Sequence, residues 1–158
     1  MKNIHINKAE IKDLVDVYKW RNNLISRRMF KNHSRVEYFK HRLWFFNSLR
    51  NKDIFLTICK KHDDGFVKIG IVRFDYFKNK KSAEVSINIS PQMRGKGLGF
   101  LCLKKSIILF KKKFVECKYL TAYVKFKNIP SIKLFNNYGF QILNKKKQFL
   151  TLIFSFYK

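Results

Sequence analysis

Strict alternation of apolar and polar side chains marks residues 84–90. The apolar positions are Val85, Ile87 and Ile89, and the polar positions between them are Glu84, Ser86 and Asn88. A period of two residues is that of a β-strand with two different faces, so one face is expected to pack inward. Pro91 follows directly and is expected to end the strand.

A helical period begins a few residues later. Leu103, Ile107, Phe110 and Phe114 recur at helical spacing, which predicts a helix over residues 97–113. Further helices are predicted at 9–20, 23–30, 35–50 and 129–138. Strands are predicted at 2–6, 53–60, 66–76, 82–90, 117–124, 140–145 and 148–157, with turns at Asp64-Gly65 and Asn79-Lys80.

The chain has 158 residues without a repeat, a low-complexity tract or a Pro/Gly/Ser-rich linker. That length can bury one sizeable core, so we expect a single domain over residues 1–158. No stretch approaches the roughly 20 apolar residues of a membrane span, and the N-terminal residues lack the apolar region of a signal peptide. A cytoplasmic protein is therefore expected. Cys59, Cys102 and Cys117 lack CxxC spacing and lie in apolar segments, which predicts reduced core thiols and no metal site.

A glycine-rich loop, Arg94-Gly95-Lys96-Gly97-Leu98-Gly99, connects the alternating strand to the helix at 97–113. Glycine has no Cβ, so backbone N–H groups can approach a phosphate closely, and the positive end of the helix dipole lies at the same place. A Walker loop is excluded because its Gly-Lys-Ser/Thr is absent, and the glycine spacing is one residue too short for the dinucleotide fingerprint. An ordinary basic loop remains the alternative.

The pattern that remains, Arg94-x-x-Gly97-x-Gly99, resembles the acyl-CoA-binding signature of the GNAT superfamily of N-acetyltransferases. The resemblance implies acetyl-CoA as cosubstrate. The contacts that it implies come from the loop and from the strand before it, at Ile87, Asn88, Ile89, Arg94, Gly95, Lys96, Gly97, Leu98 and Gly99.

A second match lies in residues 128–140. Asn128 and Ser131 suit the start of a helix, and Gly139 suits its left-handed end. This segment resembles the other CoA-side element of the superfamily, in which an Asn begins a helix that runs along the pantetheine. Cofactor contacts are thereby implied for Asn128, Ser131 and Phe135, although simple capping accounts for Asn128 and Ser131 equally well.

The order of the predicted elements resembles the GNAT fold over nearly the whole chain. The resemblance implies an α/β (α+β) fold with a mixed, mostly antiparallel sheet of about seven strands, flanked by four to five helices. It also implies that the sheet is splayed at the acetyl-CoA site.

The N-terminal half resembles the branch of the superfamily that acetylates nucleotide-linked amino sugars. The matching residues are Trp20-Arg21-Asn22, His41 with Trp44-Phe45, and Gly70 to Asp75. The nearest analogy is the 4-amino-sugar N-acetyltransferase of the pseudaminic acid and related pathways. Arg21 and Arg73 could bind a diphosphate, and Trp20 or Trp44 could stack on a base or sugar. The implied substrate contacts are Arg21, Asn22, His41, Trp44, Arg73 and Ser86. Core packing is the alternative for one of Trp44 and Phe45, and a surface salt bridge is the alternative for Arg21.

Acetylation requires a proton acceptor for the amine and, in many relatives, an acid for the departing thiolate. Glu84 resembles in position the glutamate that serves as general base, with an edge salt bridge as its alternative. His41 is the competing base, because the unperturbed pKa of histidine suits proton transfer near neutral pH. The family's usual acid is a Tyr where this chain has Phe135, so Tyr138 is the possible substitute.

A formal net charge of +25 is the main argument for a different function, because such a charge attracts nucleic acid or an anionic surface. The basic residues are mostly lysines spread from end to end, which makes a nucleic-acid partner the less favoured prediction. A second enzymatic alternative is acetylation of a protein N-terminus, as in ribosomal-protein acetyltransferases. The partner we expect is a small nucleotide-sugar substrate, and a homodimer stays open.

Overall fold

The computed structural model describes residues 4–62 and 65–157. Its strands are β1 (Ile4–Lys8), β2 (Ile54–His62), β3 (Phe66–Phe77), β4 (Ser82–Ile89), β5 (Tyr119–Lys125), β6 (Gln141–Lys146) and β7 (Phe149–Ser155). Its α-helices are α1 (Leu14–Asn22), α2 (Leu24–Met29), α3 (Tyr38–Arg50), α4 (Leu98–Lys113) and α5 (Ile129–Tyr138). Single 3-10 turns lie at η1 (Ile11–Asp13), η2 (Lys78–Lys80) and η3 (Pro91–Met93).

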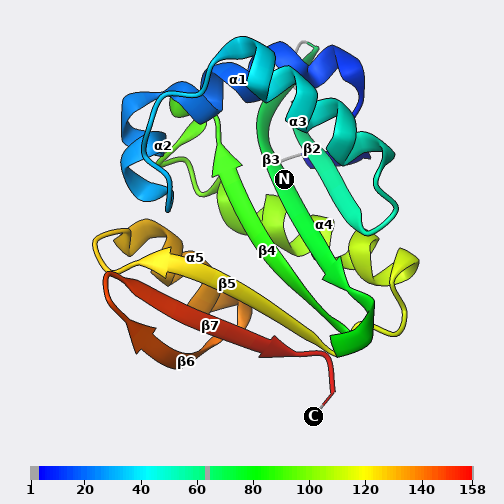
Figure 1. Ribbon diagram of the computed structural model, residues 1–158, viewed down its shortest axis with the longest axis vertical. Coiled ribbons are helices and arrows are strands. Elements are labelled where there is room, and N and C mark those ends of the chain that lie inside the picture. The colour runs from blue at the N-terminus through cyan, green and yellow to red at the C-terminus, as the bar shows by residue number, and fades with distance from the viewer. Residues whose placement is uncertain (1–3, 63–64, 158) are drawn as a thin grey trace.

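The strands form one seven-stranded sheet in the order β1-β2-β3-β4-β5-β7-β6. All neighbours are antiparallel except β4 and β5, which are parallel and pair only from Ser82 to Glu84 with Tyr119 to Thr121. Beyond Glu84 the two strands diverge, so the sheet opens between them toward the end of β4 (Figure 1). The predicted fold class, strand number, mixed pairing and splay are confirmed.

Two apolar clusters hold the helices on opposite faces of the sheet. Leu103, Ile107 and Phe110 of α4 pack with Val72 and Phe74 of β3, together with the inward face of β4. On the other face, α1 and α3 pack against β2 and β3, where Val17 and Phe45 meet Ile58 and Ile71. Figure 1 shows α1, α2 and α3 gathered over one end of the sheet, with α4 behind it. In the same view, no helix of the described residues lies in front of β5 and β7.

The predicted elements are confirmed in kind and order, with shifted ends. The predicted strand at 2–6 is β1, and its first residues, like Asp64 of the predicted turn, lie outside the described residues. The helix predicted from residue 35 begins at Tyr38, because Asn22 holds the chain before it. The Asn22 Nδ2 donates to the Val36 carbonyl at 2.9 Å, and the Val36 N–H donates to Asn22 Oδ1 at 2.9 Å.

Candidate active site

The glycine loop has the backbone geometry of a phosphate cradle. Gly95 and Gly97 adopt left-handed conformations, with φ of 72° and 68°, which favour glycine. Gly97 precedes α4, and among the described residues no side-chain hydrogen bond caps that helix end. Apart from the two adjoining residues, no atom of the described part of the chain lies within 4 Å of where a Cβ at Gly95 would be. The start of a sixteen-residue helix therefore offers free N–H donors and its positive dipole end to an anion.

Gly99 has a different role from the other two glycines. A Cβ at Gly99 would meet Leu134 Cδ1 at 2.7 Å. This glycine therefore lets α4 and α5 approach closely, rather than clearing a space for phosphate.

The Arg94 side chain points back into the protein. Its Nε donates to the Ile89 carbonyl at 3.1 Å, and its Nη2 donates to the Ser26 hydroxyl and, at 3.4 Å, to Asn88 Oδ1. Burial lowers the pKa of Arg94. The side chain thus ties the end of β4 to α2, and what the loop offers a phosphate is its backbone.

Helix α5 is built as the sequence predicts. Asn128 Oδ1 accepts a hydrogen bond from the Ser131 N–H at 3.3 Å, and Gly139 ends the helix with φ of 113°. Phe135 is only 3% exposed and packs on Phe140. The cap gives Asn128 and Ser131 a structural role, while their predicted contact with a cofactor stays a prediction.

A cleft of about 1410 Å³ opens over the splayed strands. Its floor is the outward face of β3 and β4, including Arg73, Asp75, Glu84, Ser86 and Asn88. One wall comes from the helical half, with Arg21, Lys31, Lys40, His41 and Trp44. The opposite wall comes from β5 and the β6–β7 hairpin, with Thr121, Tyr123, Lys146, Lys147 and Phe149. The structure therefore brings together most of the predicted substrate and catalytic residues, but neither Asn22 nor Tyr138 lines the cleft.

Two carboxylates face each other on the floor. Asp75 and Glu84 are register partners across β3 and β4. The Arg73 guanidinium donates to Asp75 Oδ1 from Nε at 3.1 Å and from Nη2 at 2.6 Å. Burial and then the Asp75 charge raise the pKa of Glu84, while the Arg73 charge opposes them. A carboxylate with a raised pKa is a stronger base, which suits proton transfer from an amine.

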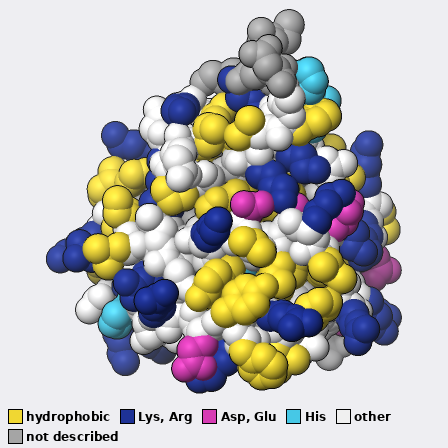
Figure 2. Space-filling view, turned by 90° about the horizontal axis from the view of Figure 1, so that it is seen from above, with side chains coloured by type: hydrophobic (Ala, Val, Ile, Leu, Met, Phe, Trp, Pro, Cys, Tyr) yellow, Lys and Arg dark blue, Asp and Glu magenta, His cyan; other side chains and the backbone are white. Residues whose placement is uncertain are grey.

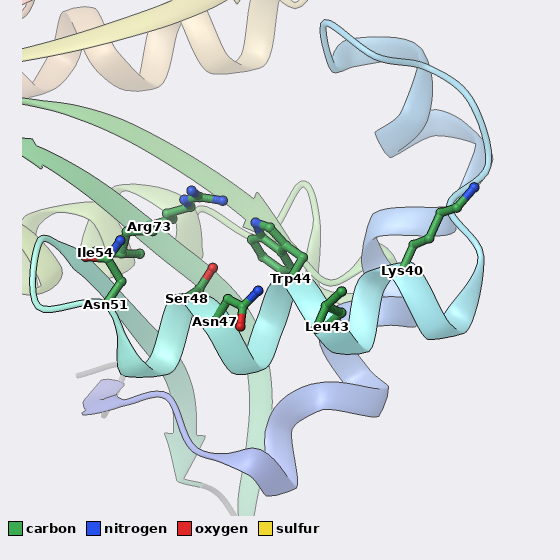
Figure 3. A pocket seen from close by; sticks show the side chains of 8 residues that line it. All are labelled: Lys40, Leu43, Trp44, Asn47, Ser48, Asn51, Ile54 and Arg73. Carbon is green, nitrogen blue, oxygen red and sulfur yellow. The ribbon is translucent and has the colours of Figure 1, made fainter.

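Arg73 also contacts Trp44, and both residues line a second, smaller hollow as well as the cleft. The guanidinium carbon lies 5.1 Å from the centroid of the indole, a cation–π distance. Figure 3 shows the two side chains reaching toward each other from β3 and α3, above a hollow of about 470 Å³ along α3. Phe45, by contrast, is fully buried. Of the two aromatics, Phe45 is therefore the core residue and Trp44 the one that a ligand can reach.

His41 is poorly suited to be the base. It is 2% exposed, and its ring lies among those of Tyr18, Trp44 and Phe45. Burial, and then the charge of Arg21, lowers the pKa of His41 to about 4. The imidazole is therefore neutral and weakly basic near pH 7. Its Nε2 is buried and lacks a hydrogen-bond partner among the described residues.

The guanidinium of Arg21, near His41, makes only some of the hydrogen bonds that it can donate. Its Nη2 donates to the Asn32 carbonyl at 2.7 Å, and its guanidinium lies 4.5 Å from the centroid of the Phe30 ring. Its Nη1 is buried without a hydrogen-bond partner, and within residues 4–62 and 65–157 no carboxylate pairs with it. Burial and then the Arg27 charge lower the pKa of Arg21. The surface salt bridge considered for this residue is thus not what the structure shows.

Several cleft residues carry little signal in the sequence. Thr121 and Tyr123 belong to a strand that reads as an ordinary half-buried one, and Lys146 and Lys147 read as a solvated hairpin turn. Asp75 stands in the segment that carries the family resemblance, yet only its register with Glu84 reveals the acidic pair.

The cysteines and the possible metal ligands add no chemistry to this site. Cys59, Cys102 and Cys117 are buried free thiols. Among the residues that the structure describes, no group of His, Cys, Asp and Glu is arranged to hold a metal ion. Within the same residues, no helix combines the length and the apolar character of a membrane span.

Comparison with solved structures finds the same fold in several proteins. A domain from Methanocaldococcus jannaschii aligns with a TM-score of 0.83 and 23% identity over 98% of this chain and 99% of its own. Spermidine N-acetyltransferase from Vibrio cholerae, solved with CoA and spermine, aligns with a TM-score of 0.83 and 15% identity over 96% of this chain and 95% of its own. The Campylobacter jejuni N-acetyltransferase PseH, solved with acetyl coenzyme A, aligns with a TM-score of 0.71 and 19% identity over 98% of this chain and 99% of its own. No curated protein matches the sequence.

A family model decides the assignment. The model described as the acetyltransferase (GNAT) domain matches residues 3–141, which include the splayed strands, the glycine loop and α5. The predictions of an N-acetyltransferase and of acetyl-CoA as its cosubstrate are confirmed at the level of the family. With the loop geometry and the fold in agreement, the chain belongs to the GNAT acetyltransferase family.

Proposed function

We propose that the protein transfers the acetyl group of acetyl-CoA to the amino group of a nucleotide-linked amino sugar. The observation that carries the proposal is the separation of charge in the cleft. The carboxylates of Asp75 and Glu84 lie on the floor, whereas the walls carry Arg21, Lys31 and Lys146. An acceptor with an amine at one end and an anionic group at the other suits both regions.

The helical wall is the part that favours an anionic acceptor. Arg21 Nη1 and His41 Nε2 are both buried and have no hydrogen-bond partner within residues 4–62 and 65–157. A buried polar atom without a partner is costly, and Arg21 lines the cleft, so its guanidinium is a cation that an anionic ligand can meet there. Arg21 retains its full charge toward such a ligand, while Arg73 is already neutralised by Asp75. We therefore assign the diphosphate to Arg21, and treat Arg73 as the residue that sets the environment of Glu84.

The floor supplies the proton acceptor. Glu84 accepts the proton of the attacking amine, and its raised pKa strengthens it for that task. Trp44, which is reachable from the cleft, offers its ring to a base or a sugar face. The free N–H groups at Gly97 and the start of α4 hold the pyrophosphate of the donor.

A panel of acceptors tests the proposal. The protein is incubated with acetyl-CoA and one of four amines: a UDP-linked 4-amino sugar, the same sugar without the nucleotide, spermidine, or a peptide with a free N-terminus. Released CoA thiol is measured. The UDP-linked sugar should give the highest kcat/KM, because it alone carries a diphosphate for Arg21.

Matched arginine variants make the test specific. Arg21→Gln should raise KM for the UDP-linked sugar about 10- to 100-fold, consistent with losing a charge-assisted hydrogen bond of about 1.5 to 3 kcal/mol, and should leave KM for the free sugar unchanged. Arg28→Gln is the control, because Arg28 is exposed on α2 and does not line the cleft. Preference for spermidine or the peptide, or equal effects of Arg21→Gln on both sugars, would contradict the proposal.

A further inference from the structure

We propose that Tyr123 is the general acid of the acetyl transfer and protonates the sulfur that leaves the thioester. The inference rests on the acetyl transfer proposed above, and assigns to it a residue of the same cleft.

Helix α5 provides no acid for this step. Phe135 has no dissociable proton and is 3% exposed. The Tyr138 ring packs between Phe140 and Phe154, with centroids 5.9 and 5.1 Å away, and Tyr138 does not line the cleft. The substitute considered from the sequence is therefore half-buried and packs against the apolar core between α5 and the sheet.

Tyr123 stands where the sheet opens. Along β5, Leu120, Ala122 and Val124 are buried, so Thr121 and Tyr123 belong to the opposite face. Thr121 is the register partner of Glu84 and the last paired residue before β4 and β5 diverge. Tyr123 lies two residues farther along, which is about 7 Å at the rise of a strand. This places it across the opening from Ser86, and both residues line the cleft.

The hydroxyl of Tyr123 is available for the reaction. The residue is 54% exposed, and within the described part of the chain nothing hydrogen-bonds its hydroxyl. A thioester whose pyrophosphate rests on the glycine loop at the end of β4 has to pass through the same opening to reach Glu84. Glu84 on β4 and the Tyr123 phenol on β5 therefore approach the thioester carbon from the two strands that diverge at this point.

The proton transfers balance as follows. The amine nitrogen forms a bond to the thioester carbonyl carbon, and Glu84 takes one proton from that nitrogen. The carbon–sulfur bond breaks, its electron pair goes to sulfur, and the Tyr123 hydroxyl gives sulfur its proton. The phenolate then regains a proton from Glu84 through solvent, so that the products are the N-acetylated acceptor and free CoA thiol.

Tyrosine-to-phenylalanine variants test the assignment. Tyr123→Phe keeps the ring and removes the proton, so kcat at saturating substrates should fall about 10²-fold while KM for both substrates stays within twofold. Tyr119→Phe is the matched control: it lies on the same face of β5, is 43% exposed, and pairs with Ser82 where the strands are still joined. Tyr138→Phe tests the competing phenol. Both of these variants should keep wild-type kcat.

Each other outcome has a definite meaning. If the wild type turns over and Tyr123→Phe has the same kcat, the acid role of Tyr123 is overturned and the proposed acetyl transfer stands. A larger fall in kcat for Tyr138→Phe than for Tyr123→Phe would have the same meaning. A rise in KM without a fall in kcat would make Tyr123 a binding residue and overturn the acid role too. Absence of turnover by the wild type with every amine would overturn the proposed function and the acid role together. The acetyl-CoA-induced rise in melting temperature shows that each variant is folded and binds the donor.

Discussion

At the scale of single residues, the environments of Glu84 and His41 separate two bases that the sequence leaves in competition. Burial disfavours the charged form of both groups, but it acts in opposite directions on them. It raises the pKa of the Glu84 carboxyl and lowers the pKa of the His41 imidazole to about 4. One residue becomes a stronger base and the other a weaker one.

Arg73 provides the test of this assignment through pH. Its charge opposes the causes that raise the pKa of Glu84, so Arg73→Met should raise that pKa further. The ionised form of Glu84 then requires a higher pH, and the acidic limb of the kcat profile should move to higher pH, while the Met side chain still packs on Trp44. Steady-state rates at saturating substrates between pH 5 and 9 would measure the shift.

Glu84→Gln is the companion to that measurement. It should lower kcat about 10² to 10⁴-fold and remove the acidic limb, because the amide cannot accept a proton. An acidic limb that survives in Glu84→Gln, or that stays in place in Arg73→Met, would show that another group accepts the proton.

At the scale of elements, local patterns predict the strand, the loop and the helix that form the cradle, because each depends on a short stretch of sequence. The period of β4, the glycines after it and the apolar stripe of α4 all agree with the structure. The cleft is less predictable, because it depends on which side chains meet across strands. Tyr123 and Asp75 gain their positions from the divergence of β4 and β5 and from the register of β3 with β4. Neither is encoded in a local pattern.

The glycine loop yields a prediction at this scale. Gly97→Val should abolish acetyl-CoA binding, because the left-handed φ of 68° strains a β-branched residue and its side chain would stand where the phosphate meets the N–H groups. Isothermal calorimetry with acetyl-CoA measures the affinity.

Gly99→Ala is the comparison for that variant. Its Cβ would press on Leu134 between α4 and α5, so we expect a lower melting temperature with acetyl-CoA affinity close to that of the wild type. Undiminished affinity in Gly97→Val would contradict the assignment of the cradle.

At the scale of the whole molecule, the charge of +25 is a general property on which a local arrangement is superimposed. Figure 2 shows lysines and arginines dispersed among apolar side chains over the face seen from above, without the continuous stripe that a nucleic-acid groove presents. The cleft differs from the rest of the surface in where its basic residues lie and not in how many there are, because they surround two carboxylates.

Two pairs of lysines can separate the local from the general effect of charge. Lys146 and Lys147 line the cleft, whereas Lys104 and Lys112 are exposed on α4 and do not. Replacing both members of either pair by Gln lowers the net charge equally. Replacing the cleft pair should raise KM for the UDP-linked sugar roughly fivefold, as expected from losing about 1 kcal/mol of attraction shared between two exposed charges. The difference in KM between this variant and the wild type should shrink in about 0.5 M salt, because salt screens the interactions of exposed charges. Steady-state kinetics at two salt concentrations measure both effects, and an equal rise for the α4 pair would attribute acceptor binding to the overall charge of the protein instead of to its cleft.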